Sequence, residues 1–507
     1  MTAIARSALL LSAAALALSA VLPAQSPSSS TPASEFQSRR ASVTKEIGRD
    51  GVLIAFSAET ARRTGDVDWP FRQEDNLLYL TGFAEPETTL VLLPGETETK
   101  ELIFVREPDP LNERWTGRIP LTAEVTAATG VREVRAARRF AGFVDGLLQG
   151  AAFGATSIAN YFRPPTFPAF LASFRSGRAQ VWLLLQDRTP TATPTREQRF
   201  ADDLRRRYPE IQIRDATPLL VAMREVKSAS EIALIQRAVD ITVAAQKAAM
   251  VRVLTATKES EVQATVEYTF RNLGACCWAF PSIVAAGRNA TTLHYMANRD
   301  PLVRDGLLLS DVGAEVEGYS ADVTRTFPAS GVFSPEQRAI YQIVFTAQEE
   351  SLPLMRPGSR FGEVQQKAQQ VVGRELLKLG LIAANVPEQV ELYMFHGVGH
   401  MLGLQTHDVY NPARPFEAGM VLTNEPGVYV RKGDILASQV FRGLAPAAQD
   451  AIRAAIDRYD GIGVRIEDDV HITAGGPVMM SSGAPRSIRE IEALMAAAKT
   501  ARPDGVR

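Results

Sequence analysis

Residues Leu307–Pro328 read LLLSDVGAEVEGYSADVTRTFP, and this stretch decides the fold of the second half of the chain. Two apolar runs flank glycines and small residues, a composition typical of a β-hairpin. If the turn is centred on Val316 and Glu317, Asp311 and Asp322 are directly opposite each other, with Cβ atoms about 5 Å apart. Like charges placed so close need a cation or a shared proton between them. The alternative is a pair of solvated aspartates at the ends of the hairpin.

The histidines of the chain favour the first alternative. All five lie in its second half, which is typical of one shared site: His294, His396, His400, His407 and His471. His396 and His400 have the spacing of a helical zinc-binding pair. No glutamate follows His396, however, and two glycines intervene, so we expect a loop or a strand there instead of a helix. Residues four apart in a strand share a face.

Two glutamates lie at the ends of apolar, strand-like runs. Glu425 precedes a Pro-Gly turn, and Glu467 follows a run that contains Val464 and Ile466. A glutamate in such a place is more often a solvated strand end than a ligand. Four carboxylates and one histidine on such segments nevertheless suit manganese, cobalt or zinc. Two such ions bridged by carboxylates can activate a shared water, so the residues alone indicate a dinuclear hydrolase site.

The segment before the hairpin predicts two helices. Residues 228–250 place apolar side chains at helical spacing opposite a charged face. Ser228 followed by Glu231 is a capping-box signature, which marks the start of a helix. A second helix is expected over residues 258–272. We predict that these helices open a catalytic domain over residues 217–497.

The first part of the chain alternates strand-like and helix-like segments. A helix is expected at residues 140–150 and a strand at residues 180–185, and three further strands are indicated by buried-type apolar runs: Val52–Phe56, Leu90–Leu93 and Leu102–Val105. Such alternation implies an α/β layer, predicted as an N-terminal domain over residues 36–216. This domain contains no histidine or cysteine. Residues 498–507 are expected to form a tail.

Charge and cysteine content narrow the function classes. The 507 residues carry a formal net charge of −2 without any basic block, so nucleic acid is not an expected partner. The two cysteines, Cys276 and Cys277, are adjacent, and neighbours in sequence rarely meet disulfide geometry without strain. We interpret them as small buried apolar side chains.

The N-terminus has the features of an export signal. Arg6 precedes an apolar segment that is short for a membrane span and ends in small residues, so residues 1–24 are predicted to be a removed secretory signal peptide. An uncleaved membrane anchor is the alternative, and no cysteine follows for a lipoprotein anchor. Residues 25–35 are rich in serine and proline and are expected to be a spacer with nothing to bury. The expected location is periplasmic or secreted, without stable membrane insertion after signal removal.

Across residues 40–495 the sequence resembles the Xaa-Pro aminopeptidases (aminopeptidase P), metallopeptidases of the pita-bread fold, with prolidase as a near relative. The resemblance is carried by motifs that occur in the family's order: Phe71–Phe83 and Glu113–Arg118 in the first domain, then LHY at 293–295, DVGAEVEGYSADVTRTFP at 311–328, HGVGHMLGLQTHD at 396–408, NEPGVYV at 424–430 and GVRIEDDV at 463–470. It implies an α/β N-terminal domain followed by an α+β pita-bread catalytic domain.

The resemblance also implies a role for each motif residue. The expected ligands of two divalent metal ions are Asp311, Asp322, His400, Glu425 and Glu467, with Asp322 and Glu467 bridging both ions. Manganese is the expected metal, with cobalt or zinc as alternatives. Glu425 doubles as the base that receives a proton from the bridging water. His294 and His407 contact the substrate carbonyl, His396 lines the proline pocket, and Arg465 orients the site. His471 matches no functional position.

The implied activity is release of the N-terminal residue from peptides with proline second, and the resemblance also implies a homo-oligomer, either a dimer or a tetramer. A bond that precedes proline has no N–H, so a dedicated pocket is needed. The alternatives are a prolidase, which cleaves only Xaa-Pro dipeptides, and a pita-bread binding protein without catalysis. A creatinase-like enzyme shares the fold but not the full carboxylate set. Residues 431–459 depart from compact relatives, with an inserted amphipathic helix expected at 445–459 that covers the cleft, forms a subunit contact or is inert.

Overall fold

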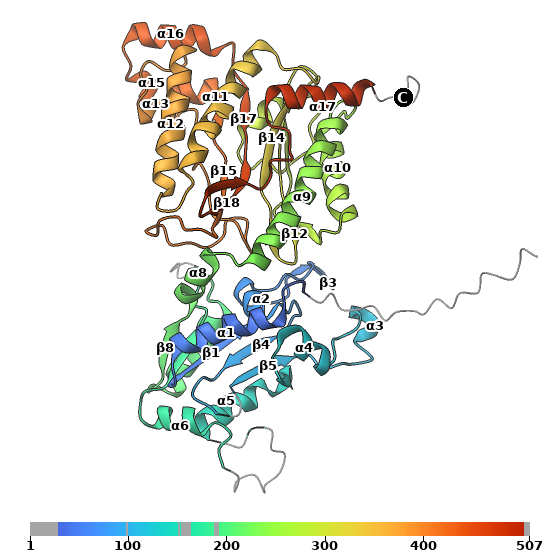
Figure 1. Cartoon of the computed structure of the whole chain (residues 1–507), viewed down its shortest axis with the longest axis vertical. Helices are drawn as coiled ribbons and strands as arrows, with labels where there is room; N and C mark the ends of the chain where they lie inside the picture. The colour runs from blue at the N-terminus through green and yellow to red at the C-terminus, as the bar shows by residue number, and fades with distance from the viewer. Residues whose placement is uncertain (1–28, 98–99, 151–152, 154–163, 187–191, 501–507) are drawn as a thin grey trace, which may run out of the picture.

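The computed structural model describes residues 29–97, 100–150, 153, 164–186 and 192–500. It has the α/β N-terminal and α+β C-terminal domains predicted from the sequence, which lie one below the other in Figure 1. The predicted signal peptide, residues 1–24, lies outside the described residues. Among the described helices, none combines the length and the apolar composition that a membrane span requires.

The N-terminal domain is built on a mixed six-stranded sheet in the order β6-β5-β4-β1-β7-β8, beside a small β2–β3 hairpin. The strands are β1 (Gly51–Phe56), β2 (Arg62–Thr64), β3 (Val67–Asp68), β4 (Thr89–Leu92), β5 (Glu101–Val105), β6 (Glu133–Ala136), β7 (Gln180–Leu183) and β8 (Gln212–Asp215). The helices are α1 (Ala33–Ile47), α2 (Asp75–Thr81), α3 (Glu113–Thr116), α4 (Thr122–Thr129), α5 (Phe140–Gln149), α6 (Pro168–Arg175), α7 (Arg196–Arg207) and α8 (Thr217–Glu225).

Both faces of this sheet are buried, which explains why its strands read as continuous apolar runs. On β1, Ile54 belongs to one hydrophobic cluster, whereas its neighbours Leu53 and Ala55 belong to a cluster on the other face. Every residue of β1 and β4 is buried. The strands predicted at 52–56, 90–93, 102–105 and 180–185 and the helix at 140–150 are confirmed within a residue or two at their ends.

The expectation that residues 25–35 have nothing to bury is wrong for the end of that stretch. Thr31 is buried, and α1 begins at Ala33. The backbone N–H of Ser30 donates to Oε2 of Glu317 at 2.8 Å, as does the Ser29 hydroxyl at 3.2 Å. The composition concealed this contact because serine side chains are themselves hydrogen-bond donors to a carboxylate of the other domain.

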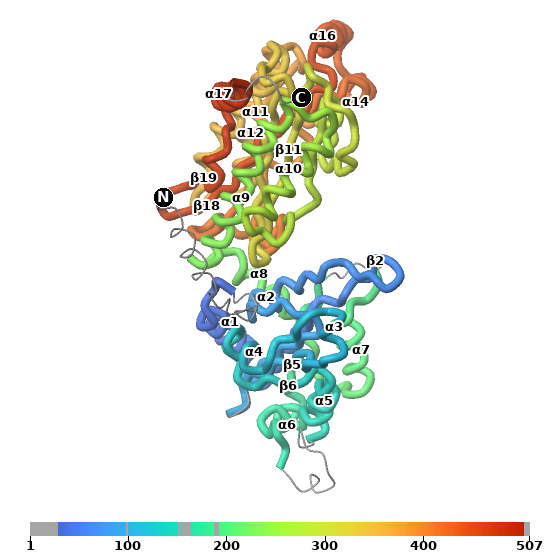
Figure 2. The backbone as a smooth tube through the Cα atoms, turned by 90° about the vertical axis from the view of Figure 1, so that its right-hand side faces the viewer, coloured from blue at the N-terminus to red at the C-terminus, as the bar shows by residue number. Residues whose placement is uncertain are grey.

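The C-terminal domain places its strands between two helix pairs, as Figures 1 and 2 show: α9 packs against α10, and α11 against α12. Its helices are α9 (Ala229–Arg252), α10 (Glu259–Asn272), α11 (Pro335–Ser351), α12 (Phe361–Lys378), α13 (Pro387–Val390), α14 (Lys432–Ala437), α15 (Gln439–Arg442), α16 (Pro446–Ile456) and α17 (Ile488–Thr500). The predicted helix start at Ser228 is confirmed, since its hydroxyl accepts from the N–H of Glu231 in a capping box.

The strands of this domain form three three-stranded sheets, β10-β11-β14, β13-β12-β9 and β15-β18-β19, and the pair β16-β17. They are β9 (Cys277–Trp278), β10 (Ile283–Ala286), β11 (Leu307–Val312), β12 (Ala314–Val316), β13 (Tyr319–Ser320), β14 (Val323–Pro328), β15 (Val421–Asn424), β16 (Gly427–Tyr429), β17 (Gly463–Arg465), β18 (Asp468–Thr473) and β19 (Gly476–Met479).

The hairpin predicted at 307–328 forms, but its expected register is wrong. Val316 pairs with Tyr319, and Asp311 is opposite Thr324 instead of Asp322. The turn is centred on Glu317 and Gly318, which have φ values of 51° and 87°. Two residues with positive φ are the requirement of a type I′ turn, and glycine meets it without a steric cost. Asp322 is therefore the diagonal neighbour of Asp311 across the hairpin, still on the same face.

The expected burial of the two cysteines is also wrong. Cys276 is exposed and Cys277 is half-buried. They lie at the start of β9, which is an edge strand that pairs only with β12 within its sheet. A strand edge leaves side chains uncovered, and the sequence of the pair alone did not reveal that β9 is an edge.

The inserted segment at 431–459 contains the expected helix, α16, with Ile452, Ile456 and Tyr459 buried. It lies at the end of the C-terminal domain that faces away from the N-terminal domain (Figure 1). The helix therefore does not cover the junction between the domains, which removes one of the three roles considered for the insertion.

Candidate metal centre

Chain segments that are far apart in the sequence meet in a cleft of about 780 Å³ at the junction of the domains. The hairpin β11–β14, the loop at 396–408, the turn between β15 and β16, and the turn between β17 and β18 each supply at least one of its lining residues. The cleft brings together all five predicted metal ligands: Asp311, Asp322, His400, Glu425 and Glu467. It also contains His294, His396, His407 and Arg465, so every predicted site residue lines one cavity.

His400 is the hub of the predicted ligands. Its Nε2 lies 3.5 Å from Oδ2 of Asp322 and 3.5 Å from Oε1 of Glu425. The same nitrogen is 3.8 Å from Oε1 of Glu467. Donor atoms of Asp322, His400 and Glu467 all lie within 4.8 Å of one another, a spacing that suits one shared cation.

The hydrogen bond at the other ring nitrogen fixes the tautomer of His400. Its Nδ1 is 3.0 Å from the carbonyl oxygen of Met401, which can only accept, so Nδ1 carries the proton. In the neutral form of the ring, Nε2 is therefore the nitrogen without a proton, and it faces the carboxylates. A histidine that donates its other N–H to a backbone carbonyl has the arrangement usual for a metal ligand.

The buried carboxylates repel one another. Burial and the charge of Asp311 raise the pKa of Asp322 well above its usual value. Burial and the charge of Asp322 raise the pKa of Glu467 in the same way. Among the described residues, Oδ1 of Asp311 and Oδ1 of Asp322 are buried without a hydrogen-bond partner. Unpartnered buried oxygens beside a deprotonated imidazole nitrogen fit divalent cations, which would satisfy both the charge and the lone pairs.

Second partners hold these carboxylates in position. Thr324, the residue opposite Asp311, donates its hydroxyl to Oε2 of Glu467 at 2.7 Å. The backbone N–H of Asp322 donates to Oδ2 of Asp469 at 3.1 Å. Sequence reasoning assigned no role to Thr324 or Asp469, although both lie inside the quoted motifs.

Arg465 links the metal centre to His396 through a chain of donors. Its guanidinium pairs with Oδ2 of Asp311 and donates from Nη1 to the Tyr429 hydroxyl at 2.9 Å. The Tyr429 hydroxyl lies 2.8 Å from Nε2 of His396, whose Nδ1 lies 2.8 Å from the Gly397 carbonyl. Because that carbonyl accepts from Nδ1, Tyr429 donates to Nε2. Tyr429 stood in a quoted motif, but only the fold shows that it joins Arg465 to His396.

The mouth of the cleft holds the two predicted substrate histidines. His294 and His407 are both exposed, and the His407 ring lies 4.2 Å from that of His400, centroid to centroid. Partial burial in the cleft disfavours the charged form of His407 and so lowers its pKa, and the neighbouring His400 adds to this effect. His407 is therefore neutral at neutral pH and can donate one N–H to a ligand. Burial likewise lowers the pKa of His396.

The N-terminal domain contributes to the same cleft through Arg72 and Asp75. Arg72 donates from Nη1 to Asp75 at 2.6 Å and from Nε to Oε2 of Glu315 at 3.0 Å. Sequence reasoning had quoted both residues in a motif without a site role. Their position depends on the packing of one domain on the other, which no local pattern reports.

Comparison with known proteins gives consistent results for both domains. Residues 36–153 match the description "Aminopeptidase P, N-terminal domain", and residues 233–474 match "Metallopeptidase family M24". Two proteins named Xaa-Pro aminopeptidase, from Haemophilus influenzae and Escherichia coli, each align with 92% of this chain and are 32% identical to it over the aligned residues. The alignments cover 97% and 98% of those proteins, respectively.

Solved aminopeptidase structures agree with the sequence comparisons. Aminopeptidase P from E. coli with the inhibitor Pro-Leu superposes with a TM-score of 0.77 at 30% identity, covering 93% of this chain and 99% of that one. The aminopeptidase PepP of Pseudomonas aeruginosa gives 0.77 at 31% identity, with 93% and 99% coverage. The C-terminal domain therefore has the pita-bread fold that the motifs implied.

We expect the stabilisation of the protein by divalent metal to increase with pH. The raised pKa values of Asp322 and Glu467 mean that the metal-free folded protein binds more protons than the unfolded chain above pH ~4. These groups therefore make the metal-free protein less stable as pH rises, whereas bound cations need the deprotonated forms. The rise in Tm on adding Mn²⁺ should be larger at pH ~8 than at pH ~5.5. A pH-independent rise would contradict this account of the centre.

Proposed function

Because the chain belongs to the Xaa-Pro aminopeptidases of metallopeptidase family M24, we propose that it releases the N-terminal residue from peptides with proline second, with two divalent ions in the cleft. Membership of this family makes the protein a metallo-exopeptidase. The observation that carries the proposal is the convergence of five donor residues, with unpartnered buried carboxylate oxygens, on a cleft open to solvent. When bound, the ions would lower the pKa of a shared water and polarise the scissile carbonyl.

Within this proposal, Asp322 and Glu467 would serve both ions. Asp311 would hold one of the ions, and His400 and Glu425 would hold the other. The distances of 3.5 Å and 3.8 Å from Nε2 of His400 to Asp322 and Glu467 support a common neighbourhood for these groups. We propose manganese as the metal because oxygen-rich donor sets with one imidazole suit it, with cobalt or zinc as alternatives.

Glu425 is positioned to accept a proton. Its side chain is 16% exposed, whereas that of Glu467 is 2% exposed, so Glu425 faces the open part of the cleft. The hydroxyl of Thr423 donates to Oε1 of Glu425 at 3.5 Å and accepts from the backbone N–H of His400 at 3.0 Å. A carboxylate held beside the attacking water can take its proton and later deliver it to the leaving nitrogen.

His407 and His294 are proposed to bind the substrate carbonyl. A neutral His407, which its lowered pKa supports, donates an N–H to the oxygen as negative charge develops there. His396 is proposed to line the proline pocket. Hydrogen bonds from Arg465 to Tyr429 and from Tyr429 to His396 hold the His396 ring in one orientation. The ring therefore offers a fixed surface to the rigid proline ring of the substrate.

The choice between aminopeptidase and prolidase is tested with Arg-Pro-Pro and an Xaa-Pro dipeptide, each assayed with Mn²⁺ and after chelation. We expect Mn²⁺-dependent release of arginine from the tripeptide, because the cleft of about 780 Å³ is open and has room beyond a dipeptide. Cleavage of the dipeptide alone would identify a prolidase. Silence on both substrates with metal bound would leave the substrate unidentified, whereas a purified protein that binds no metal would support the non-catalytic alternative.

His407→Ala should reduce kcat for Arg-Pro-Pro by about 10²–10³, the usual effect of losing one group that stabilises an oxyanion. Metal content should not change, because His407 is not a proposed ligand. His471→Ala is the matched control, since His471 lies on β18 between Val421 and Val478 and is not among the cleft residues. We expect the control to retain wild-type kcat. Full activity of His407→Ala would show that its proposed role is wrong.

Export of the enzyme rests on the sequence of residues 1–24 and remains a proposal. An exported enzyme would act on peptides from extracellular protein breakdown. Fractionation of the native host should place the activity in the periplasm or the medium. Activity confined to the cytosol would rule this out.

A homo-oligomer is also proposed. Several large apolar side chains of the N-terminal domain are exposed, and exposed apolar surface is common where subunits meet: Trp69, Leu111, Trp115 and Leu121. Light scattering on the purified protein should give the mass of a dimer or tetramer, and a monomer at micromolar concentration would contradict it.

A further inference from the structure

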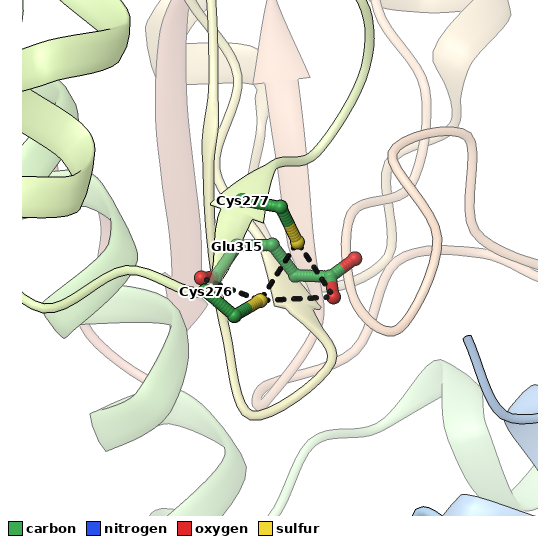
Figure 3. Close-up of side chains that lie close together, drawn as sticks. All are labelled: Cys276, Cys277 and Glu315. Atoms are coloured by element: carbon green, nitrogen blue, oxygen red, sulfur yellow. Dashed lines mark hydrogen bonds between the residues drawn. The ribbon is translucent and has the colours of Figure 1, made fainter. Parts of the chain in front are cut away.

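A second group of metal-type donors lies outside the proposed catalytic centre and shares no residue with it. It consists of the thiols of Cys276 and Cys277 and the carboxylate of Glu315. Figure 3 shows the two sulfur atoms and this carboxylate turned toward one another. Oε1 of Glu315 is 3.5 Å from Sγ of Cys276 and 3.6 Å from Sγ of Cys277, and the sulfur atoms are 2.7 Å apart.

The backbone fixes this arrangement. Cys277 is the register partner of Glu315 between β9 and β12. The N–H of Cys276 donates to the backbone oxygen of Glu315 at 3.2 Å. Both thiols are thereby held over one carboxylate on a sheet edge, although the side chains of consecutive strand residues usually point to opposite faces.

The two carboxylate oxygens of Glu315 have different partners. Its side chain is 7% exposed, and Oε2 accepts from Nε of Arg72 at 3.0 Å. Among the described residues, the recorded side-chain partners of Oε1 are the two thiols. The ion pair with Arg72 therefore fixes the orientation of the Glu315 carboxylate, with Oε1 turned toward the sulfur atoms.

The spacing of the donors suits a tetrahedral ion. An ion that holds sulfur at about 2.3 Å and oxygen at about 2.0 Å separates the two donors by about 3.5 Å. Both sulfur–oxygen distances are close to this value. The two sulfur atoms would need to move apart to about 3.8 Å, which the exposed side chain of Cys276 permits by rotation.

We propose that Cys276, Cys277 and Glu315 form a site for one thiophilic divalent cation of the zinc and cadmium class, separate from the catalytic centre. Two thiolates and one carboxylate fill three tetrahedral positions, and the fourth faces solvent. Thiolates select soft and borderline ions, whereas the oxygen-rich catalytic donors accept harder ones such as manganese. The chain would thus sort two kinds of metal ion between two sites.

Binding at this site would release protons. Each thiol loses its proton to solvent when its sulfur joins the cation, while the Glu315 carboxylate stays paired with Arg72. The hydrogen bond with Cys277 lowers the pKa of the Cys276 thiol, whereas the same contact and burial raise the pKa of the Cys277 thiol. A bound cation would compensate the charge of both thiolates.

Titration of the reduced, Mn²⁺-saturated full chain with Cd²⁺ tests the proposal. The thiolate-to-cadmium charge-transfer absorption reports this site alone, because the chain has only two cysteines and no proposed catalytic ligand is a cysteine. We expect saturation at one Cd²⁺ per chain. Cys276→Ser and Cys277→Ser should each weaken Cd²⁺ binding by at least about 100-fold, and Glu315→Gln by about 10-fold or more.

Glu317→Gln is the matched control, since Glu317 lies on the same hairpin but is not one of the three donors. It should bind Cd²⁺ as the unchanged protein does. Hydrolysis of Arg-Pro-Pro by the cysteine variants serves as a separate check that they fold, and it does not depend on this site. If one serine variant keeps full Cd²⁺ affinity, a lone thiol binds the ion and the proposal is wrong. Saturation at half an equivalent would mean that the ion bridges two chains, which would also overturn it.

Discussion

Like charges buried in one place are the constraint on which the catalytic domain depends. Asp311, Asp322 and Glu467 are each less than 10% exposed, and Glu425 lies beside them. Burial and repulsion by the neighbouring carboxylates raise the pKa values of Asp322 and Glu467 and so favour the protonated forms of these two groups. Cations would reverse this preference, so metal binding and the stability of the domain are linked. The surrounding fold must therefore hold the carboxylates together when they repel as well as when they are neutralised.

Two buried arginines meet this requirement. Arg465 pairs with Asp311, and Arg325 donates to Oδ1 of Asp468 at 2.6 Å and to the Glu467 backbone oxygen at 2.7 Å. Breaking a buried ion pair by removing one partner costs about 3–5 kcal/mol, because the other charge is left without compensation. Arg325 thus fixes the backbone that carries Glu467, and Arg465 fixes Asp311. The two arginines join the hairpin to the β17–β18 turn independently of any metal ion.

Local sequence patterns predicted most of the helices and strands, but they did not predict the contacts between segments that are distant in the sequence. The helix start at Ser228 followed from its own capping residues, and the strands followed from apolar runs. The hairpin register did not, because the turn was assigned without considering that Gly318 accepts positive φ. Cys276 was expected inside because its exposure depends on where β9 lies in its sheet. The motifs identified residues that gather in one cleft, but the link from Tyr429 to His396 and the contribution of Arg72 arise only when distant segments pack.

Packing between the domains also helps to fix the position of His407, one of the two histidines proposed to bind the substrate carbonyl. Asp408 follows His407 directly and is buried between Arg224, at 2.6 Å, and Lys227, at 3.1 Å. Arg224 also donates to Oδ1 of Asn76 at 2.8 Å, on α2 of the N-terminal domain. Since all of these charges are 2% exposed or less, the contact is rigid, and moving the N-terminal domain would leave Asp408 without part of its compensation. The loop that presents His407 is thus anchored by the domain junction as well as by the catalytic domain that carries it.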